Sequence, residues 1–463
     1  MPTSAPASEP AQESAPSDES PPAAAAAPVA ATEPADDGPL LDAAGLEALA
    51  DVLSERGPAH ADLTGLDTTR RALLEPSGPV AVDGTALWRL GRVLELNNDT
   101  AAAITAYNTA LDALPADDAV SRAIVTMRLG RLLADRRQFQ ERAVQLTAAA
   151  ATSLEALHAE SAAGVEITSV IESLLALAHA QGRHKQISEA FATLQRGSEL
   201  ASAALPSNHP IRAQLSRQHG RTQFMNRRFA EARDRLQTLH ERVSDVYGAS
   251  SPLAISIADD LALALKRSGA GAVAVETFLS GHIDHVSEAY GVDHPKTIKT
   301  RFDALQTNLM IVRQIGRDTE ERQIRAERVR HTAEALIDSL PPDSLDAADA
   351  WGILGTLDVQ LDEEKRAGEA WKKAYDIRRA RLGDDSRDTM LAYSGYGRSI
   401  WLTEDPARGR AIIDDVIARA RTSDDVQIKG LASNLITMLD RLEARAPSGA
   451  GDSSDEGSAS EDG

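Results

Sequence analysis

Two histidines three residues apart, His282 and His285, are the arrangement in this sequence that most resembles a metal site. On a helix this spacing places both imidazoles on one face, with Asp284 and Glu288 nearby. Catalytic zinc sites use three protein ligands, and no third ligand follows here at a recognisable spacing. The pair is therefore interpreted as part of a solvated helix face, and no bound metal is predicted.

Other motifs of catalysis are missing from the sequence. Gly269 and Gly271 imitate a dinucleotide-binding glycine loop, but that loop must follow a strand, and residues 255–266 have a helical pattern. The chain has no phosphate-binding loop, no HExxH motif, no GxSxG motif and no cysteine. We therefore expect no cofactor, no catalytic residues and no enzymatic activity.

Charge is unevenly distributed along the 463 residues, which include 49 basic and 70 acidic side chains and carry a net charge of −21. Residues 1–38 contain seven acidic residues and residues 447–463 contain five, without a basic residue in either, so the body of the chain is only mildly acidic. This composition predicts neither a nucleic-acid partner nor attraction to a membrane surface. No apolar run approaches the roughly 18 residues of a membrane helix, and the first basic residue is Arg56, which does not fit a signal or transit peptide. A cytoplasmic protein is expected.

Composition also divides the chain into five regions. Residues 1–38 are rich in Pro, Ala and Glu, and residues 447–463 in Ser, Gly and acids; neither has enough large apolar side chains to offset the entropy of folding, so both are predicted to be disordered tails. Between them the prolines are few and grouped, which indicates helices separated by junctions. Helices in 39–83 are predicted to cap a repeat array over 84–423, and a helix in 424–446 to close it.

A six-residue junction recurs along the array. Each copy starts with Leu or Tyr, and most turn through Gly or Pro and then offer a residue suited to capping the next helix. His209 and His294 occupy equivalent junction positions, which favours a capping or packing role for both. A second break about 21 residues after most starts predicts two antiparallel helices per unit and about eight helix pairs. The junctions start, at separations of 43, 48, 42, 43, 50 and 42 residues, at Leu114, Leu157, Leu205, Tyr247, Tyr290, Leu340 and Leu382.

Residues inside the units resemble tetratricopeptide repeats, in which a large residue and Leu-Gly in the first helix meet Ala, an aromatic residue and Ala in the second. Two units match this spacing, through Leu87, Leu90, Gly91, Ala103, Tyr107 and Ala110 and through Trp351, Leu354, Gly355, Ala367, Trp371 and Ala374. The period is similar to that of the longer repeats of kinesin light chains and many bacterial repeat proteins. The resemblance implies an all-α solenoid, a right-handed superhelix of antiparallel helix pairs with the first helices on its concave side. Gly355 and Ala367 are then expected to face each other.

The sequence departs from the kinesin light chain pattern in two places. The paired asparagines that grip a bound peptide in that family are replaced at the matching positions by Arg217-Gln218, Asp259-Asp260 and Gln306-Thr307. The unit after Tyr290 has a second helix rich in Arg and Glu over 317–330. Its mixed signs favour a solvated face with weak ion pairs over a docking surface.

The resemblance favours a non-catalytic scaffold that binds a protein or an extended peptide in the concave groove. Arginine can bind carboxylates through paired hydrogen bonds and aromatic side chains can anchor apolar ones, so an acidic partner is expected. The alternative is a regulatory sensor whose curvature shifts when a small molecule or signalling peptide binds, and an enzyme that uses the His282 region is the third hypothesis. Partner identity, pathway and oligomeric state cannot be read from the residues. The repeat frame places these candidate contact residues on the first helices: Trp88, Arg92, Arg131, Arg217, Arg221, Phe224, Lys266, Arg313, Arg398 and Trp401.

Overall fold

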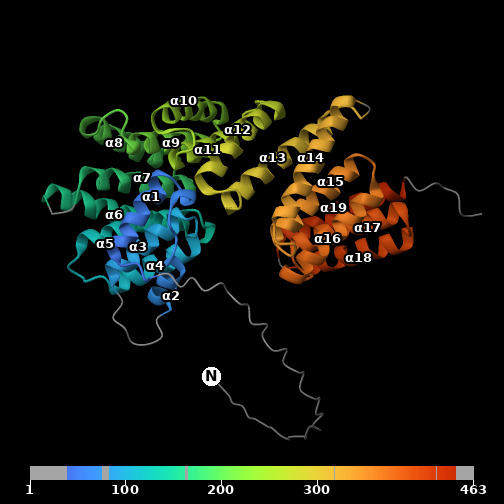
Figure 1. Ribbon diagram of the computed structural model, residues 1–463, viewed down its shortest axis with the longest axis horizontal. Coiled ribbons are helices and arrows are strands. Elements are labelled where there is room, and N and C mark those ends of the chain that lie inside the picture. Colours follow the sequence, from blue (N-terminus) through green and yellow to red (C-terminus); the bar gives the residue numbers. More distant parts are fainter. Residues whose placement is uncertain (1–38, 76–82, 162–164, 318, 424, 445–463) are drawn as a thin grey trace, which may run out of the picture.

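The computed structural model describes residues 39–75, 83–161, 165–317, 319–423 and 425–444, and the two tails predicted to be disordered lie outside these residues (Figure 1). All regular elements in the described residues are helices. Before the array come α1 (Ala43–Glu55), the short 3₁₀ helix η1 (Pro58–His60) and α2 (Leu66–Leu74). The array and its last helix comprise α3 (Gly84–Leu96), α4 (Thr100–Ala113), α5 (Ala119–Ala134), the 3₁₀ helix η2 (Arg137–Phe139), α6 (Gln140–Ala159), α7 (Ile167–Arg183), α8 (Ile187–Ala204), α9 (Pro210–Met225), α10 (Phe229–Tyr247), α11 (Pro252–Arg267), α12 (Ala272–Tyr290), α13 (Pro295–Gln314), α14 (Glu320–Ser339), α15 (Leu345–Gln360), α16 (Glu364–Leu382), α17 (Arg387–Thr403), α18 (Pro406–Thr422) and α19 (Val426–Glu443).

The helices from α3 to α18 stack as eight consecutive pairs, from α3 with α4 to α17 with α18, and neighbouring pairs pack against each other (Figure 1). Each predicted unit forms one pair. The chain therefore folds as an all-α solenoid of the tetratricopeptide type, as its repeat predicted. None of the described helices combines the length and the apolarity that a membrane crossing requires.

The predicted junctions end one helix and cap the next. The side chains of Asp118, Ser251 and Ser344 each accept a hydrogen bond from a backbone N–H in the first turn of the helix that follows. His209 and His294 act in the same way, because Nδ1 of each ring accepts from the backbone N–H two residues later, at 3.3 and 3.1 Å. The predicted capping role of these two histidines is confirmed.

Glycine lets the two helices of a pair approach closely in both halves of the array. A Cβ atom at position 91 would lie 2.6 Å from the ring of Tyr107, and one at position 355 would lie 2.8 Å from the ring of Trp371. Neither position has room for a side chain. The residue that covers Gly355 most closely is Trp371, which lies one helical turn beyond Ala367 on α16.

The charged helix α14 is only in part the solvated face that its alternating signs predicted, since Glu321 and Arg328 are exposed and Glu321 pairs with Arg325 one turn away, but other arginines are buried. Arg322 and Arg330 are only 7% and 6% exposed. Arg330 Nη2 donates to Asp358 of α15 at 2.9 Å, and Arg325 Nη1 lies 2.9 Å from Glu276 of α12. Arginines of this helix therefore bridge to the helices on both sides, which the charge pattern of one helix alone could not indicate.

The segment before the array does more than cap its end. Helix α1 packs on α3 through Leu46, Leu49 and Leu53, which are buried. The following η1 contacts α12, the second helix of the fifth pair. Figure 1 shows α1 between α3 and the helices of the later N-terminal pairs. The N-terminal segment consequently connects the two ends of the arc formed by the first five pairs.

Candidate functional site

A cavity of about 880 Å³ lies among the N-terminal helix pairs. Its walls come from the first helices α3, α5, α7, α9, α11 and α13, with the end of α1 as a further wall, so it occupies the concave side of the array. Its volume is in the range of pockets that hold drug-sized ligands. We call it the basic chamber, because four cationic side chains line it: Arg131, Arg217, Arg221 and Lys296.

Carboxylates surround the cations of the basic chamber, and Glu55, Glu95 and Asp135 line it as well, but they leave part of the guanidinium donors unused. Arg217 Nε donates to Asp260 Oδ2 at 2.6 Å, and Arg221 Nε lies 3.8 Å from the other oxygen of the same carboxylate. Lys296 Nζ is 2.9 Å from Asp259 Oδ2, and Arg131 is paired with Glu95. Within the described part of the chain, Arg221 makes no hydrogen bond and Arg217 uses only Nε. Several guanidinium N–H donors are therefore available to a ligand.

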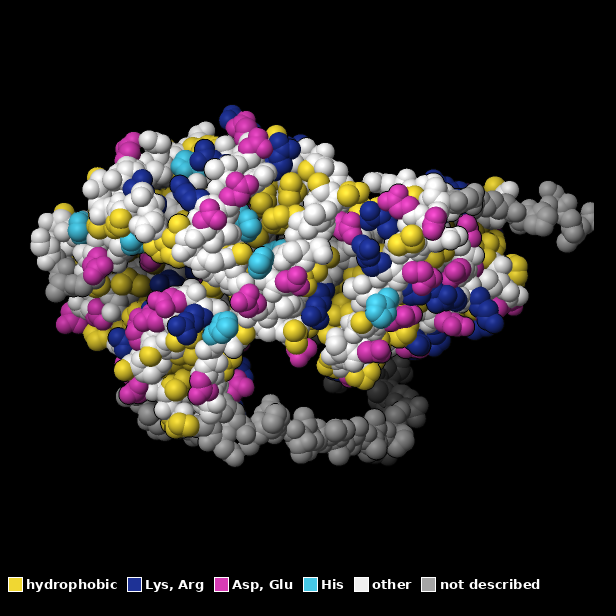
Figure 2. Space-filling view, turned by 45° about the horizontal axis from the view of Figure 1, so that its top comes forward, with side chains coloured by type: hydrophobic (Ala, Val, Ile, Leu, Met, Phe, Trp, Pro, Cys, Tyr) yellow, Lys and Arg dark blue, Asp and Glu magenta, His cyan; other side chains and the backbone are white. Residues whose placement is uncertain are grey.

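The cations also repel one another across the chamber. Burial lowers the pKa of Arg131 and of Arg221 below the usual range; Glu172 and Asp260 respectively oppose this decrease, and the charge of Arg217 adds to it. Arginine nevertheless keeps its proton at neutral pH, so the repulsion is not relieved by titration. On the face of the molecule shown in Figure 2, by contrast, basic and acidic side chains are interspersed over the surface. An anion in the chamber would reduce this repulsion.

A buried histidine forms part of the wall beside the arginines. His179 of α7 is 5% exposed, and its Nε2 lies 3.3 Å from Asp135 Oδ1. Burial lowers the pKa of His179 to about 4, so the ring is neutral at pH 7. Burial alone would raise the pKa of Asp135, but the hydrogen bond with His179 and the nearby Arg221 lower it to about 2. Asp135 therefore stays ionised and balances part of the positive charge.

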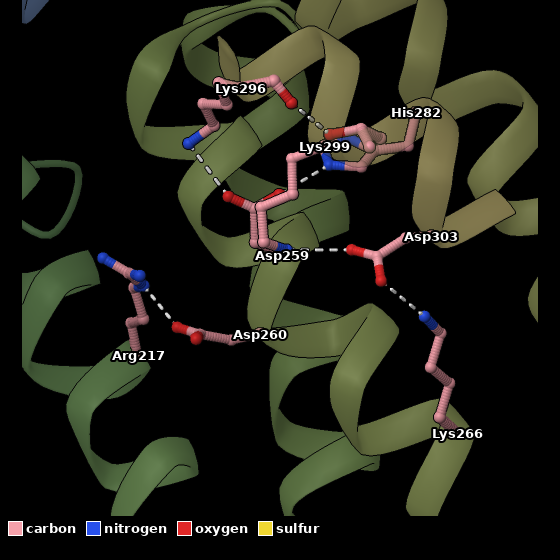
Figure 3. Close-up of polar contacts among 9 residues, drawn as sticks. Arg217, Asp259, Asp260, Lys266, His282, Lys296, Lys299 and Asp303 are labelled. Atoms are coloured by element: carbon pink, nitrogen blue, oxygen red, sulfur yellow. Dashed lines mark hydrogen bonds and ion pairs between the residues drawn. The ribbon is translucent and has the colours of Figure 1, made fainter. Parts of the chain in front are cut away.

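His282 is buried behind the chamber, where it contacts Asp259 (Figure 3). It is 4% exposed, and its Nε2 is 2.9 Å from Asp259 Oδ1, so the solvated position predicted for it is wrong. Burial opposes ionisation of Asp259, but the hydrogen bond from His282 and the charge of Lys296 hold its pKa well below the usual range. His285 lies instead 3.3 Å from Ser250. The described residues contain no group of three His, Asp or Glu side chains arranged to hold a metal ion.

The ten candidate contact residues are divided by the fold. Arg131, Arg217 and Arg221 line the basic chamber, and Arg92 lines an adjoining cavity together with Arg131. Three aromatic candidates pack against apolar cores instead of forming a groove surface: Trp88, Phe224 and Trp401. The remaining three lie apart from the chamber, with Lys266 paired to Asp303, Arg398 paired to Glu364 and Arg313 exposed.

Several chamber residues were not among the candidates. Lys296, Asp135 and His179 come from three different units, and the α1 wall comes from outside the array. Lys296 follows the capping His294 by two residues, so superposing the repeat units on the junctions could have placed it at a helix start. The contact of the α1 segment with the fifth pair has no counterpart in the repeat pattern.

Comparisons with known proteins concern the fold. No family model matches the chain, and no curated protein matches it. Among solved structures, a putative kinesin light chain with tetratricopeptide-like repeats from Podosopora anserina is 14% identical, with a TM-score of 0.40 over 47% of this chain and 98% of that one. The apo quorum sensor NprR from B. thuringiensis is 11% identical, with a TM-score of 0.44 over 68% and 85%. A signal transduction ATPase with a tetratricopeptide repeat sensor from Pyrococcus horikoshii is 12% identical, with a TM-score of 0.46 over 82% and 57%.

Proposed function

We propose that this protein is a non-catalytic scaffold that binds an acidic segment of a protein or peptide partner in the basic chamber. One observation carries the proposal: cations from α5, α9 and α13 converge on one cavity, and Arg217 and Arg221 share a single carboxylate there. The side chains of Arg217 and Arg221 are 25% and 29% exposed, and this partial enclosure strengthens a charge-assisted hydrogen bond relative to the same bond at an open surface.

The apolar part of the chamber suits a peptide. Leucines from four first helices line the cavity beside the charged groups: Leu96, Leu132, Leu175 and Leu253. A peptide could place acidic side chains on the arginines and aliphatic side chains on these leucines. Mixed contacts of this kind dominate the binding energy of many protein interfaces.

The chamber also supports the second function, a regulatory sensor. Its walls come from six first helices and from α1, so one ligand would contact many successive pairs at once. Because each pair of a solenoid contacts chiefly its neighbours, drawing these helices together would change the curvature of the array. Scattering of the protein with and without a bound peptide tests this function, since a sensor should change its radius of gyration.

Partner identification and mutation test the scaffold. We expect crosslinking in cells to capture a partner, and the Arg217→Ala/Arg221→Ala variant to bind that partner about a hundredfold more weakly, because two charge-assisted contacts are lost. The matched control is Arg398→Ala, which removes a first-helix arginine outside the chamber and should leave the affinity unchanged. Unchanged binding of the double variant, with its helicity intact by circular dichroism, would rule out the chamber as the contact site.

A further inference from the structure

The end of α1 and the turn after it form a wall of the basic chamber. Leu53, Ser54 and Glu55 line the cavity on the side where the arc of helix pairs is open. The chain then reaches α12 at Gly57, where a Cβ atom would lie only 2.5 Å from the carbonyl oxygen of Ala289. We call residues 53–60 the closing segment. It leaves no gap between the first and the fifth pair at this point.

Both ends of the closing segment are held in place. On one side, α1 is fixed to α3 by its buried leucines, and Arg92 of α3 pairs with Glu47 and Asp51 of α1. On the other side, Gly57 has a φ of +90°, a conformation that glycine adopts freely and that a side chain would strain. Pro58 follows it and is buried. The segment is therefore a packed wall and not a loosely attached linker.

A wall on this side changes which ligands can enter. An open groove accepts an internal stretch of a long chain from the side, whereas a ring accepts a chain only when a free end passes through it. We propose that the closing segment makes the basic chamber selective for acidic peptides with a free end, and that it excludes acidic segments held at both ends within a folded partner. This inference rests on the proposed function, because it assumes that the chamber is the binding site.

Gly57 is the residue that determines this selectivity. Replacing it with alanine would place a methyl group against the Ala289 carbonyl, so the closing segment would have to move away from α12. The substitution changes no charge. Gly248 offers a matched control, because it has a similar φ of +86° but nothing within 4 Å of an added Cβ. Gly248→Ala thus has the same backbone strain without the steric displacement.

The test compares two forms of one acidic sequence by calorimetry with the full chain. The first probe is free hexaglutamate, and the second is hexaglutamate inserted into a surface loop of a folded carrier domain. For the unmodified protein we expect the free probe to bind at least about tenfold more tightly than the loop probe. Gly57→Ala should bring this ratio close to one, and Gly248→Ala should leave it unchanged.

A second variant keeps the test independent of the stability of Gly57→Ala. Asp51→Asn and Glu47→Gln together weaken the attachment of α1 to Arg92. They also remove two negative charges, which should strengthen the binding of both probes alike. The ratio of the two affinities is therefore insensitive to this change in charge. Equal binding of both probes to the unmodified protein would overturn the closed-ring inference while leaving the proposed function intact. The inference would also be overturned if the ratio of the two affinities stayed at its unmodified value in both Gly57→Ala and the Asp51→Asn/Glu47→Gln variant. If the free probe does not bind, the proposed function is contradicted and the inference with it.

Discussion

Arg221 and Arg398 occupy the same position in their repeats, sixteen residues after the junction starts at Leu205 and Leu382, yet their surroundings differ. Arg221 lies 3.8 Å from a carboxylate that Arg217 already binds. Arg398 has its own partner, since both its Nη atoms donate to Glu364, at 2.6 and 3.2 Å. Arg221 therefore lines the chamber with N–H donors that make no hydrogen bond within the described residues, whereas Arg398 is bound by a carboxylate of the protein.

The comparison shows that repeat position alone does not make a binding residue. What differs is whether a carboxylate binds the guanidinium group directly, and how many helices face one cavity. In the N-terminal half, several first helices and α1 enclose a common cavity, so cations from distant units meet. In the C-terminal half, the guanidinium of Arg398 is bound by the neighbouring α16, which supplies Glu364.

The largest expected effect is the loss of stability when the close glycine-aromatic contact, which both halves contain, is disrupted. Gly91→Leu and Gly355→Leu should each lower the free energy of unfolding by about 1–3 kcal/mol, because each side chain would overlap an aromatic ring that cannot retreat. The control is Gly281→Leu, at a helical position with nothing within 4 Å of an added Cβ. Urea unfolding measures all three. A neutral result for Gly355→Leu would mean that its helix pair is not packed as described.

Removing the carboxylate partners tests the difference between the halves. Glu364→Gln should lower the free energy of unfolding by about 1–2 kcal/mol, because it leaves a half-buried arginine without its anion. Asp260→Asn should lower the free energy of unfolding by less, because Arg217 and Arg221 also face the solvent of the chamber. The same substitution should raise the affinity for free hexaglutamate. Equal costs for the two variants would show that Asp260 satisfies its arginines as fully as Glu364 does.

Acid should destabilise the N-terminal half through His179. Its folded-state pKa of about 4 lies below the ordinary histidine value of about 6.5, so the unfolded chain binds more protons between these pH values. The contribution of His179 to the free energy of unfolding is then fully present above pH 6.5 and is lost as the pH falls toward 4. The loss amounts to about 1 kcal/mol between pH 7 and 5.5. His179→Gln should flatten this slope in thermal melts. If the stability of the variant falls with pH as steeply as that of the unmodified protein, other titrating groups cause the effect.

The smallest expected effect is that of salt. Raising NaCl from 0.1 to 0.5 M should weaken hexaglutamate binding about threefold, since screening acts less on enclosed charges than on exposed ones. Arg398→Ala should show the same salt dependence as the unmodified protein, whereas Arg217→Ala/Arg221→Ala should show almost none. An affinity independent of salt in the unmodified protein would indicate that apolar contacts carry the binding.

The sequence by itself determined the architecture. The recurring junctions, the capping His209 and His294 and the glycine-aromatic motif of two units are short-range features, and each repeat is held by its own helices and their neighbours. The same locality indicated which residues sit on first helices, including Arg131, Arg217 and Arg221.

Only the tertiary structure decided which of these residues meet. Arg131 and Lys296 lie in different units far apart in the chain, and they face one cavity because the stacked pairs curve. The burial of His282 against Asp259 and the closure at Gly57 likewise depend on contacts between helices that the repeat pattern does not specify. The repeated residues determine how each helix pair packs on the next. The chamber depends in addition on the summed rotations between successive pairs and on a segment outside the repeats.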